Sequence, residues 1–364
     1  MKIIIFAGGS GRRLWPISRV KSPKQFEPII DKKSTLQLAV DRVLDVYGAE
    51  NIFVSTNERY QELVRSQLPQ LPAEQIIGEP DRRDLAAAVG LAMAHIAQSS
   101  PTAADEPVAI LWGDNYLEHV SDFRTILKGA EKLLQGSSSR IFFIGETPRF
   151  ANDNLGWLGL GQHITHDGKI PAYGFESLTY RPQREECQRM FASGSYVWNT
   201  GYFVTTPGFV RDLYRRYQPD MWAKLVEIEA AIGRPEYEET LHNVYPEIQS
   251  ISFDDAILTH VPAKDAAVLH GELGWSDPGT LYALKEAIDP SKDRNVIKGT
   301  VVDEQSHDCL IYNYTPDKLV VTVGLEGMIV VNTEDALLVV HKDQIPLVKK
   351  VVENFEGTAL EAFS

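Results

Sequence analysis

Apolar and polar positions along the first part of the chain predict strands and helices in turn. Short apolar runs rich in β-branched residues predict buried strands, and apolar residues at helical spacing predict helices between them. The predicted strands lie at 2–6, 51–55, 75–77, 108–112 and 140–144, and the predicted helices at 35–47, 58–67, 85–98 and 123–134. This alternation is typical of βαβ units, whose right-handed crossovers place strands in one parallel sheet. We therefore expect an α/β fold with ligands at the carboxyl ends of the strands.

The pattern changes towards the end of the chain. An amphipathic helical stretch at 207–232 is followed, beyond residue 288, by short β-rich segments separated by turns. These segments lie at 296–302, 309–312, 319–323, 328–331 and 336–341, before a helix at 345–355. We therefore predict a large domain at 1–287 and a small β domain with a closing helix at 288–364. No clean internal repeat is visible in the small domain.

Composition and charge limit the partners. Among 364 residues, Lys and Arg number 36 and Asp and Glu number 50, so the net charge is 36 − 50 = −14. This balance argues against a nucleic-acid or anionic-membrane partner. Cys187 and Cys309 are too few for a disulfide framework and favour a reducing compartment. Without a signal peptide or an apolar run of membrane-spanning length, we expect a cytoplasmic protein.

A glycine-rich loop follows the first predicted strand. Ala7 is followed by Gly8, Gly9 and Gly11. Glycines let backbone N–H groups close around phosphate oxygens, because they adopt positive φ without steric cost. Arg13 and Lys24 supply positive charge nearby, and together these groups suit a nucleoside triphosphate. A plain glycine turn with solvent-facing arginines is the alternative.

Two common phosphate loops do not fit this stretch. The dinucleotide fingerprint needs a third glycine where this chain has Leu14, and Pro16 and Pro23 prevent the helix that should follow directly. The P-loop needs a Gly-Lys-Ser/Thr sequence, which is absent.

The stretch instead resembles the signature of sugar-1-phosphate nucleotidyltransferases. Leu14, Trp15 and Pro16, together with the Pro-Lys-Gln-Phe sequence that begins at Pro23, resemble the mannose-1-phosphate guanylyltransferase branch. The resemblance implies a Rossmann-like, mostly parallel sheet and a β-helix-like C-terminal domain that often assists dimer contacts. It also implies a reaction of GTP with a hexose 1-phosphate, most simply mannose 1-phosphate, to give a GDP-sugar and pyrophosphate.

The segment before the predicted helix at 85–98 corresponds to the family's base pocket. Glu79 and Arg83 match the family's Glu-Pro and Arg positions, but Asp84 stands where the family has Asn. A carboxylate at Asp84 could accept from the N–H donors on guanine's Watson–Crick edge and would offer nothing to uracil's acceptors. A plain helix N-cap is the alternative, because aspartate accepts from the first free N–H groups of a helix.

Two aspartates are candidates for a metal site. Asp114 follows Gly113 at the end of a predicted strand, where the nucleotide is expected, and matches the family's Pro-Ala-Asp-His with Asn115 replacing the histidine. Asp277 matches the aspartate of the family's Gly-Trp-Ser-Asp. Carboxylates suit Mg²⁺, and the resemblance makes both aspartates its ligands. Aspartates in ordinary turns are the alternative.

The expected sugar-phosphate residues depart most from the family. Gly156 lies in the family's sugar-contacting Gly-Tyr-Gly-Tyr region, and Asn199 keeps the Trp-Asn-Ser/Thr-Gly pattern. Tyr180 and Arg181 replace the glutamate and lysine of Val-Glu-Lys-Pro; arginine can still hold a phosphate, in a different geometry. Asp255 likewise replaces the tyrosine of Ser-Ile-Asp-Tyr-Ala. Tyr180 as a core residue and Asn199 as a turn residue are the alternatives.

Three functions remain open from the sequence. The first is catalysis with Arg13 and Lys24 on the triphosphate, Asp114 and Asp277 on Mg²⁺, and the sugar phosphate held by Arg181 and Asn199. The second is the same chemistry with another sugar 1-phosphate. The third is a non-catalytic GDP-sugar sensor, which the departures from the family pattern motivate, although a sensor would not need both metal carboxylates.

Overall fold

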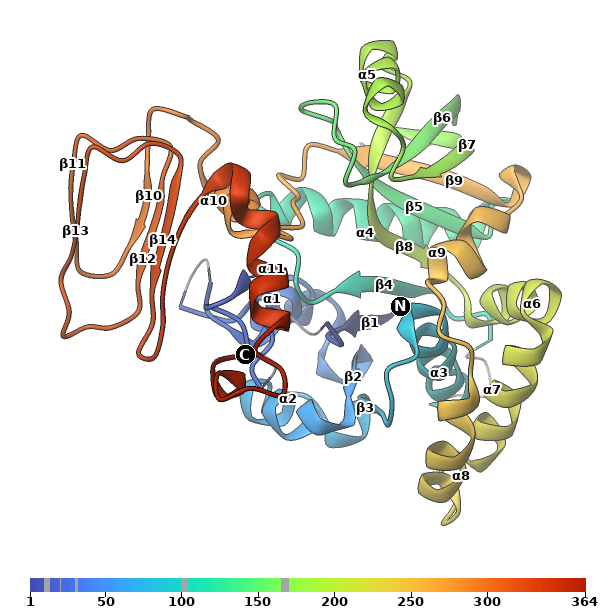
Figure 1. Ribbon diagram of the computed structural model, residues 1–364. Helices are drawn as coiled ribbons and strands as arrows, with labels where there is room; N and C mark the ends of the chain where they lie inside the picture. Colours follow the sequence, from blue (N-terminus) through green and yellow to red (C-terminus); the bar gives the residue numbers. More distant parts are fainter. Residues whose placement is uncertain (10–13, 20, 30–31, 100–103, 165–169) are drawn as a thin grey trace. The chain divides into compact units, whose positions relative to one another are not determined.

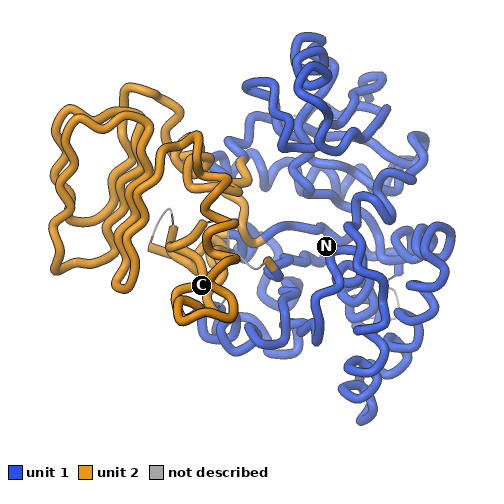
Figure 2. The backbone as a smooth tube through the Cα atoms, viewed as in Figure 1, with its two compact units in different colours: residues 1–8, 39–112, 117–275 blue, residues 9–38, 113–116, 276–364 orange. Residues whose placement is uncertain are grey.

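The computed structural model describes residues 1–9, 14–19, 21–29, 32–99, 104–164 and 170–364. The backbone forms two compact units, each built from segments far apart in the sequence (Figure 2). Unit 1 consists of Met1–Gly8, Ala39–Trp112 and Leu117–Trp275, and unit 2 of Gly9–Leu38, Gly113–Tyr116 and Ser276–Ser364. The domain boundary between residues 287 and 288 stays a prediction.

A sheet runs through unit 1 and has nine strands among the described residues, in the order β3-β2-β1-β4-β8-β5-β9-β7-β6 (Figure 1). The strands are β1 (Lys2–Phe6), β2 (Ile52–Asn57), β3 (Ile76–Glu79), β4 (Val108–Trp112), β5 (Ile141–Glu146), β6 (Gly156–Ile164), β7 (Ala172–Tyr180), β8 (Tyr196–Thr205) and β9 (Ala266–Gly271). Ile3, Ile4 and Ile5 of β1 are fully buried, as expected for a central parallel strand.

The predicted α/β class is confirmed, but the sheet is mixed rather than mostly parallel. β3, β2, β1 and β4 are parallel, whereas β8 is antiparallel to β4 and β5, and β7 is antiparallel to β6 and β9. The connection between β6 and β7 is too short for the crossover that a parallel pair needs, so these two strands form a hairpin.

Five strands of unit 1 close into a ring. β8, β5, β9, β7 and β6 are neighbours in that order, and β6 pairs back onto β8. Phe143, Leu158, Phe175 and Val197 come from four of these strands and belong to one buried apolar cluster. Gly156 pairs with both Tyr180 and Asn199, so these three predicted sugar-phosphate residues meet at one end of the ring.

Helices pack against the sheet of unit 1. α3 contacts α6, α7 and α9, while α4 contacts β5, β8 and β9. The predicted helical stretch at 207–232 is two helices, because Gln218 has non-helical dihedral angles before Pro219 begins the second. The helices in chain order are α1 (Thr35–Tyr47), α2 (Gln61–Gln67), α3 (Asp84–Ser99), α4 (Val120–Gly136), α5 (Arg184–Ser193), α6 (Pro207–Tyr217), α7 (Pro219–Ala231), α8 (Tyr237–Val244) and α9 (Phe253–Ala256). A membrane-spanning helix is absent from the described part of the chain.

Unit 2 contains stacked short strands between two helices, α10 (Leu281–Ile288) and α11 (Ile345–Glu353). One sheet has the order β10-β12-β14-β15, and β11 pairs in parallel with β13. The strands are β10 (Val296–Lys298), β11 (Val301–Glu304), β12 (Leu310–Asn313), β13 (Val320–Val323), β14 (Met328–Asn332) and β15 (Leu337–His341). β10, β12 and β14 are parallel, and β15 is antiparallel to β14. This is the predicted β-helix-like arrangement.

Stacked polar side chains explain how successive coils stay in register. Asn332 Nδ2 donates to Asn313 Oδ1 at 2.8 Å, and Thr322 Oγ1 donates to Asp303 Oδ1 at 2.6 Å. Both pairs are separated by 19 residues. The coils therefore repeat locally at this spacing, although the residues on successive coils differ too much for a repeat to be visible in the sequence.

The core of unit 2 includes residues from the start of the chain. Leu14, Ile17 and Ile29 are buried in one apolar cluster with strand residues such as Leu310 and Ile329. Trp15 Nε1 also donates to the carbonyl of Phe363 at 2.7 Å. Leu14 of the Leu-Trp-Pro sequence therefore packs in the core of unit 2, and Trp15 bonds the end of the chain.

Asp308 anchors α10 and the end of β15 to the coils. It is 3% exposed and accepts from Tyr282 Oη at 2.9 Å, while Lys285 Nζ and Lys342 Nζ lie 2.9 and 2.6 Å from its two oxygens. Burial opposes ionisation of Asp308, but the hydrogen bonds from Lys342, Lys285 and Tyr282 lower its pKa to about 2.

Asp308→Asn is therefore expected to lower the free energy of unfolding by about 3 kcal/mol, because it leaves the buried ammonium of Lys285 without its carboxylate. Asparagine tolerates the positive φ of 55° at this position, so the substitution tests charge rather than backbone strain. In the parent protein, the ionised Asp308 stabilises the folded state fully above about pH 3.9, the pKa of aspartate in the unfolded chain. This stabilisation is lost as the pH falls towards 2.

Urea unfolding at pH 7 and at pH 3 measures both effects, with the exposed Asp317→Asn as control. Equal unfolding free energies for Asp308→Asn and the parent protein at pH 7 would contradict the assignment.

Candidate active site

Lys24, Asp114 and Asp277 come together in unit 2. Lys24 Nζ lies 2.7 Å from Asp114 Oδ2 and 3.2 Å from Asp277 Oδ1. Lys24 is 7% exposed, whereas the side chains of Asp114 and Asp277 are 31% and 37% exposed. The three residues come from distant parts of the sequence, so the fold builds a compact group with a buried cation and two carboxylates open to solvent.

Lys24 remains charged in this environment. Burial alone would lower the pKa of its ammonium group, but the charges of Asp114 and Asp277 and their hydrogen bonds raise it above its usual value. Lys24 begins a short 3-10 helix, Lys24–Phe26, directly after Pro23, whose fixed φ starts the turn. The local backbone therefore presents a permanently positive group to both carboxylates.

An antiparallel bridge joins the two aspartate loops. Tyr116 N donates to Ser276 O at 3.0 Å, and Ser276 N donates to Tyr116 O at 3.1 Å. Asp114 lies two residues before one side of this bridge, and Asp277 lies next to the other. Asn115 Nδ2 approaches Asp114 Oδ1 at 3.4 Å. The predicted pairing of the two aspartates therefore has a backbone cause.

The carboxylate pair fits a hard divalent cation. Both groups already share one cation, the Lys24 ammonium, and both offer oxygen atoms, which Mg²⁺ prefers. Two carboxylates supply only part of an octahedral shell, and Mg²⁺ typically completes it with water and substrate phosphates. The donor set therefore fits a metal that would be bound together with a phosphorylated substrate.

Another cluster of potential ligands lies on the surface of unit 1. Glu58, Glu238 and His242 are exposed, and His242 Nε2 is 3.1 Å from Glu58 Oε2. A hydrogen bond to the carbonyl of Glu238, together with these acidic groups, raises the pKa of His242. The hydrogen bonds between His242 and these acidic residues account for the cluster without a metal ion.

The described parts of the glycine loop have defined partners. In unit 1, Ala7 N donates to Ser55 O at 2.7 Å, so the N–H of this predicted nucleotide residue is already used by the sheet. A Cβ on Gly8 would lie 3.6 Å from Glu79 Oε1. In unit 2, Gln25 Nε2 donates to Gly9 O at 3.0 Å and ties the loop to the segment of Lys24. Gly11 and Arg13 lie outside the described residues.

Glu79 ends β3 as a buried carboxylate at the carboxyl edge of the parallel strands. It is 8% exposed, accepting from Tyr245 Oη at 2.7 Å and Ser55 Oγ at 3.3 Å. Burial raises the pKa of Glu79 to about 7, although these two hydrogen bonds act in the opposite direction. Its position beside Gly8 and its raised pKa make Glu79 a candidate site residue.

Asp84 begins α3 with a positive φ of 62°. Its Oδ1 accepts from the N–H of the next residue, Leu85, at 2.8 Å, whereas an N-cap side chain typically accepts from an N–H two or three residues further on. Asp and Asn adopt this left-handed conformation more readily than other side chains. Arg83 is held nearby by Asp81, with Nη2 2.7 Å from Oδ2.

Tyr180 and Arg181 form an exposed pair at the end of β7. The Arg181 guanidinium lies 5.0 Å from the centroid of the Tyr180 ring, and Arg181 has a positive φ of 47°. Tyr180 is 43% exposed, which excludes the alternative of a core residue. A strained backbone at a surface arginine often marks a functional position.

Asn199 combines a turn role with a position beside the expected sugar residues. Its Oδ1 accepts from Gly201 N at 3.0 Å, as the turn alternative expected. Gly156 faces it, since a Cβ on Gly156 would lie 3.3 Å from Asn199 Cβ. Gly201 has a φ of 76°, and a Cβ there would meet Trp112 Nε1 at 2.2 Å, which explains the glycine of this motif.

Asp254 lies near Tyr180 and Arg181 and is a further candidate for the site. Burial raises its pKa to about 6, and its charge interacts with those of Asp255, Arg181 and Asp84. The sequence already pointed to Asp254, because it is the aspartate that this chain keeps in the Ser-Ile-Asp-Tyr-Ala pattern. Its carboxylate stands near Tyr180, the position where the family's glutamate is lost.

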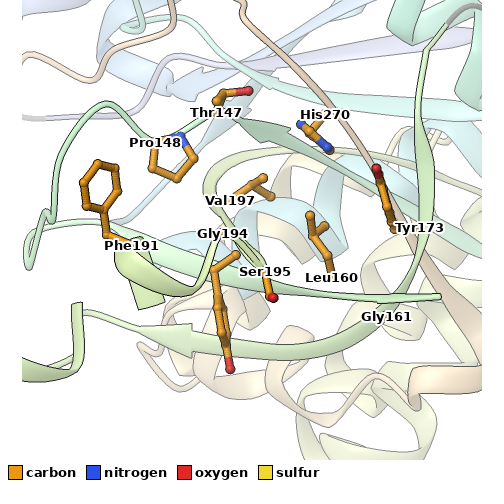
Figure 3. Close-up of a pocket in the computed structure, with 11 residues that line it drawn as sticks. Thr147, Pro148, Leu160, Gly161, Tyr173, Phe191, Gly194, Ser195, Val197 and His270 are labelled. Carbon is orange, nitrogen blue, oxygen red and sulfur yellow. The ribbon is translucent and has the colours of Figure 1, made fainter. Parts of the chain in front are cut away.

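A cavity of about 400 Å³ opens at the other end of the strand ring (Figure 3). Its lining includes Thr147, Leu160, Tyr173, Val197 and His270, from or next to each strand of the ring. Among the described residues, this lining does not include a predicted site residue. Pocket shape alone would therefore have pointed away from the residues identified above.

Two family models match successive regions of the chain. Residues 2–293 match the family model described as nucleotidyl transferase, and residues 299–355 match the model of a mannose phosphate isomerase/GMP-like β-helix domain. The chain is 30% identical to the mannose-1-phosphate guanylyltransferase ManC of Salmonella typhimurium strain LT2 over 97% of this chain and 73% of that protein. It is 29% identical to the mannose-1-phosphate guanylyltransferase of Escherichia coli strain K12, with the same coverage.

A solved structure is also similar over the whole chain. The crystal structure described as mannose-1-phosphate geranyltransferase from Thermus thermophilus has a TM-score of 0.84 and 25% identity, covering 98% of this chain and 99% of that one. The match of the family model to most of the chain and the identity to relatives covered over 73% of their length lead to one assignment. The chain belongs to the nucleotidyl transferase family and is a nucleotidyltransferase.

Proposed function

We propose that the protein is a mannose-1-phosphate guanylyltransferase, which converts GTP and mannose 1-phosphate to GDP-mannose and pyrophosphate. The observation that supports this most is the convergence of Lys24, Asp114 and Asp277 in unit 2. The choice of GTP and mannose 1-phosphate rests on the names of the relatives. The charged groups at Lys24, Asp114 and Asp277 suit phosphate and metal.

The reaction is a single displacement. A phosphate oxygen of the sugar 1-phosphate attacks the α-phosphorus of GTP, and the new P–O bond forms as the bond between the α-phosphorus and the bridging oxygen breaks. Pyrophosphate leaves with the electron pair of that bond, so no covalent enzyme intermediate is required. Catalysis then consists of positioning and charge stabilisation.

Lys24, with Arg13, would hold the triphosphate, while Asp114 and Asp277 would hold Mg²⁺. When bound, Mg²⁺ neutralises charge on the phosphate oxygens. Lys24 is paired with both carboxylates in this structure. In the reacting complex, Asp114 and Asp277 would hold the cation, and Lys24 would donate to a phosphate oxygen.

The remaining predicted residues divide between base and sugar. We assign the nucleotide to the loop of Ala7, Gly8, Gly9 and Gly11, to Gly113, and to Glu79, Arg83 and Asp84. The sugar phosphate is assigned to Gly156, Tyr180, Arg181 and Asn199. Because GTP and sugar phosphates are intracellular metabolites, we place the reaction in the cytoplasm. We further propose a homodimer, which light scattering on the purified protein would test.

Pyrophosphate release across four nucleoside triphosphates and several sugar 1-phosphates tests the function. We expect the highest kcat/KM for GTP with mannose 1-phosphate. A preference for another sugar would change the substrate but keep the reaction class. Binding of GDP-sugars without turnover of any pair would contradict the proposal.

Base selection gives a sharper prediction. Asp84→Ala is expected to reduce the preference for GTP over UTP by at least about tenfold, because hydrogen bonds to charged groups contribute about 1.5–3 kcal/mol. Asp84→Asn, which tolerates the same backbone conformation, separates loss of charge from backbone strain.

The measurement is the ratio of kcat/KM values for the two nucleotides, with the exposed Glu334→Ala as control. If both Asp84 variants discriminate as the parent protein does, the carboxylate does not read the base.

A further inference from the structure

We propose that Glu146 is a positioning residue for the loop that carries Asp277. The inference rests on the proposed function and adds to it a residue that contacts neither expected substrate. Glu146 ends β5, is 2% exposed, and lies opposite Gly271 of β9 and Trp198 of β8. A carboxylate buried this deeply must be matched by hydrogen bonds or an ion pair.

The backbone of Leu273, Gly274 and Trp275 provides that match. Leu273 N donates to Glu146 Oε2 at 2.8 Å. Burial raises the pKa of Glu146 to about 7, although hydrogen bonds from the backbones of Leu273, Trp275 and Gly274 and the charge of Arg149 act in the opposite direction. These are the last three residues of unit 1 before the chain continues through Ser276 to Asp277. The carboxylate therefore holds the backbone immediately before the proposed metal ligand.

Arg149 bonds both Glu146 and the backbone of Trp275. Its Nη1 donates to Glu146 Oε1 at 3.0 Å, and its Nη2 donates to the carbonyl of Trp275 at 3.1 Å. Both oxygens of Glu146 are thus used, one by the loop and one by the arginine. Charge-assisted bonds of this kind are shorter and stronger than neutral ones.

The chain segment that follows Asp114 also contacts the segment Leu273–Trp275. Leu273 O accepts from Glu118 N at 3.2 Å and from His119 N at 2.9 Å, shortly after the turn of Asp114. Gly274 has a φ of 59°, and a Cβ there would meet Glu118 Cβ at 2.6 Å. Glu146 therefore acts at the point where the chain segments leading from Asp114 and to Asp277 run side by side.

Glu146→Gln keeps the size of the side chain but loses part of its hydrogen bonding. Leu273 N and Arg149 Nη1 donate to different oxygens of Glu146, and glutamine replaces one of these oxygens with an N–H₂ group that faces a donor. We expect the loop to lose its fixed position while the core of unit 1 stays packed. Removing an outer partner of this kind typically lowers metal affinity or activity by about 10- to 100-fold.

The experiment compares Glu146→Gln with the parent protein by Mn²⁺ titration in the presence of GTP, followed by electron paramagnetic resonance. The control is Glu247→Gln, an exposed carboxylate that pairs with Lys224 at 2.8 Å. Measurements are made where circular dichroism shows all proteins fully folded. We expect Mn²⁺ affinity to fall at least about tenfold in Glu146→Gln, and kcat to fall with little change in KM for the sugar phosphate.

Each other outcome overturns the inference. Unchanged Mn²⁺ affinity and kcat would show that the loop needs no such support, and a parent protein that binds no Mn²⁺ would leave no metal loop to position. An equal loss in the Glu247→Gln control would show a general effect of charge. Failure of the proposed function looks different, because the parent protein would then turn over no substrate pair while Mn²⁺ affinity still distinguished the two variants.

Discussion

Asp277→Asn is expected to lower kcat/KM for pyrophosphate release by about a thousandfold, the upper range for loss of one group that stabilises transition-state charge. The amide keeps the shape of the side chain but removes a formal charge from a pair that shares one cation. Asp114 alone would then have to balance Lys24 and hold the metal. We expect the Mg²⁺ concentration needed for half-maximal rate to rise strongly as well.

The control for this prediction is Asp317→Asn, which changes an exposed aspartate in the same unit. Thermal unfolding should show both variants folded at the assay temperature. Activity of Asp277→Asn within about tenfold of the parent protein, with unchanged Mg²⁺ dependence, would remove this aspartate from the site.

The second large effect is expected for Lys24→Met. The substitution keeps the apolar stem of a side chain that is 7% exposed but leaves two carboxylates without their shared ammonium. We expect kcat/KM to fall by about 10²–10³, because a positive group on the triphosphate is lost. The variant should also unfold at a lower temperature, and Mg²⁺ should recover part of that loss by supplying the missing counter-charge.

Lys24→Arg is not expected to restore activity, since a planar fork cannot replace a compact ammonium between two carboxylates. Lys21→Met, an exposed lysine close in sequence, is the matched control. Should Lys24→Met retain GTP turnover near the parent level, or should Lys21→Met lose as much, the role assigned to Lys24 would be wrong.

The sequence was sufficient for elements whose pattern is local. Strands such as β1 and helices such as α1 follow from apolar runs and helical spacing, and the structure places both where they were predicted. The hairpin of β6 and β7 was not predicted, because its residues carry little alternation and its partners β8 and β9 come much later in the chain. Without those pairings, a mostly parallel sheet was the simplest expectation.

The sequence likewise identifies some residues of the candidate site but not others. Asp114 and Asp277 were recognised from short motifs, but nothing in their spacing could show that a two-residue bridge through Tyr116 and Ser276 joins their loops. Glu146 carried no signal at all, since its role depends on backbone donors that lie far along the chain. Motifs identify groups that act on a substrate, whereas the groups that hold them become visible only in the folded chain.

Leu14 and Trp15 illustrate a different limit. They belong to the stretch that resembles the nucleotidyltransferase signature, yet in the structure Leu14 packs in the core of unit 2 and Trp15 bonds the end of the chain. A motif can therefore mark a subfamily through packing rather than chemistry.

A crystal structure with a non-hydrolysable GTP analogue, mannose 1-phosphate and Mn²⁺ tests the central claim most directly. We predict an anomalous Mn²⁺ peak bonded to carboxylate oxygens of both Asp114 and Asp277, with Lys24 moved from the carboxylates to a phosphate oxygen. A nucleotide whose phosphates and metal contact none of these three residues would contradict the account.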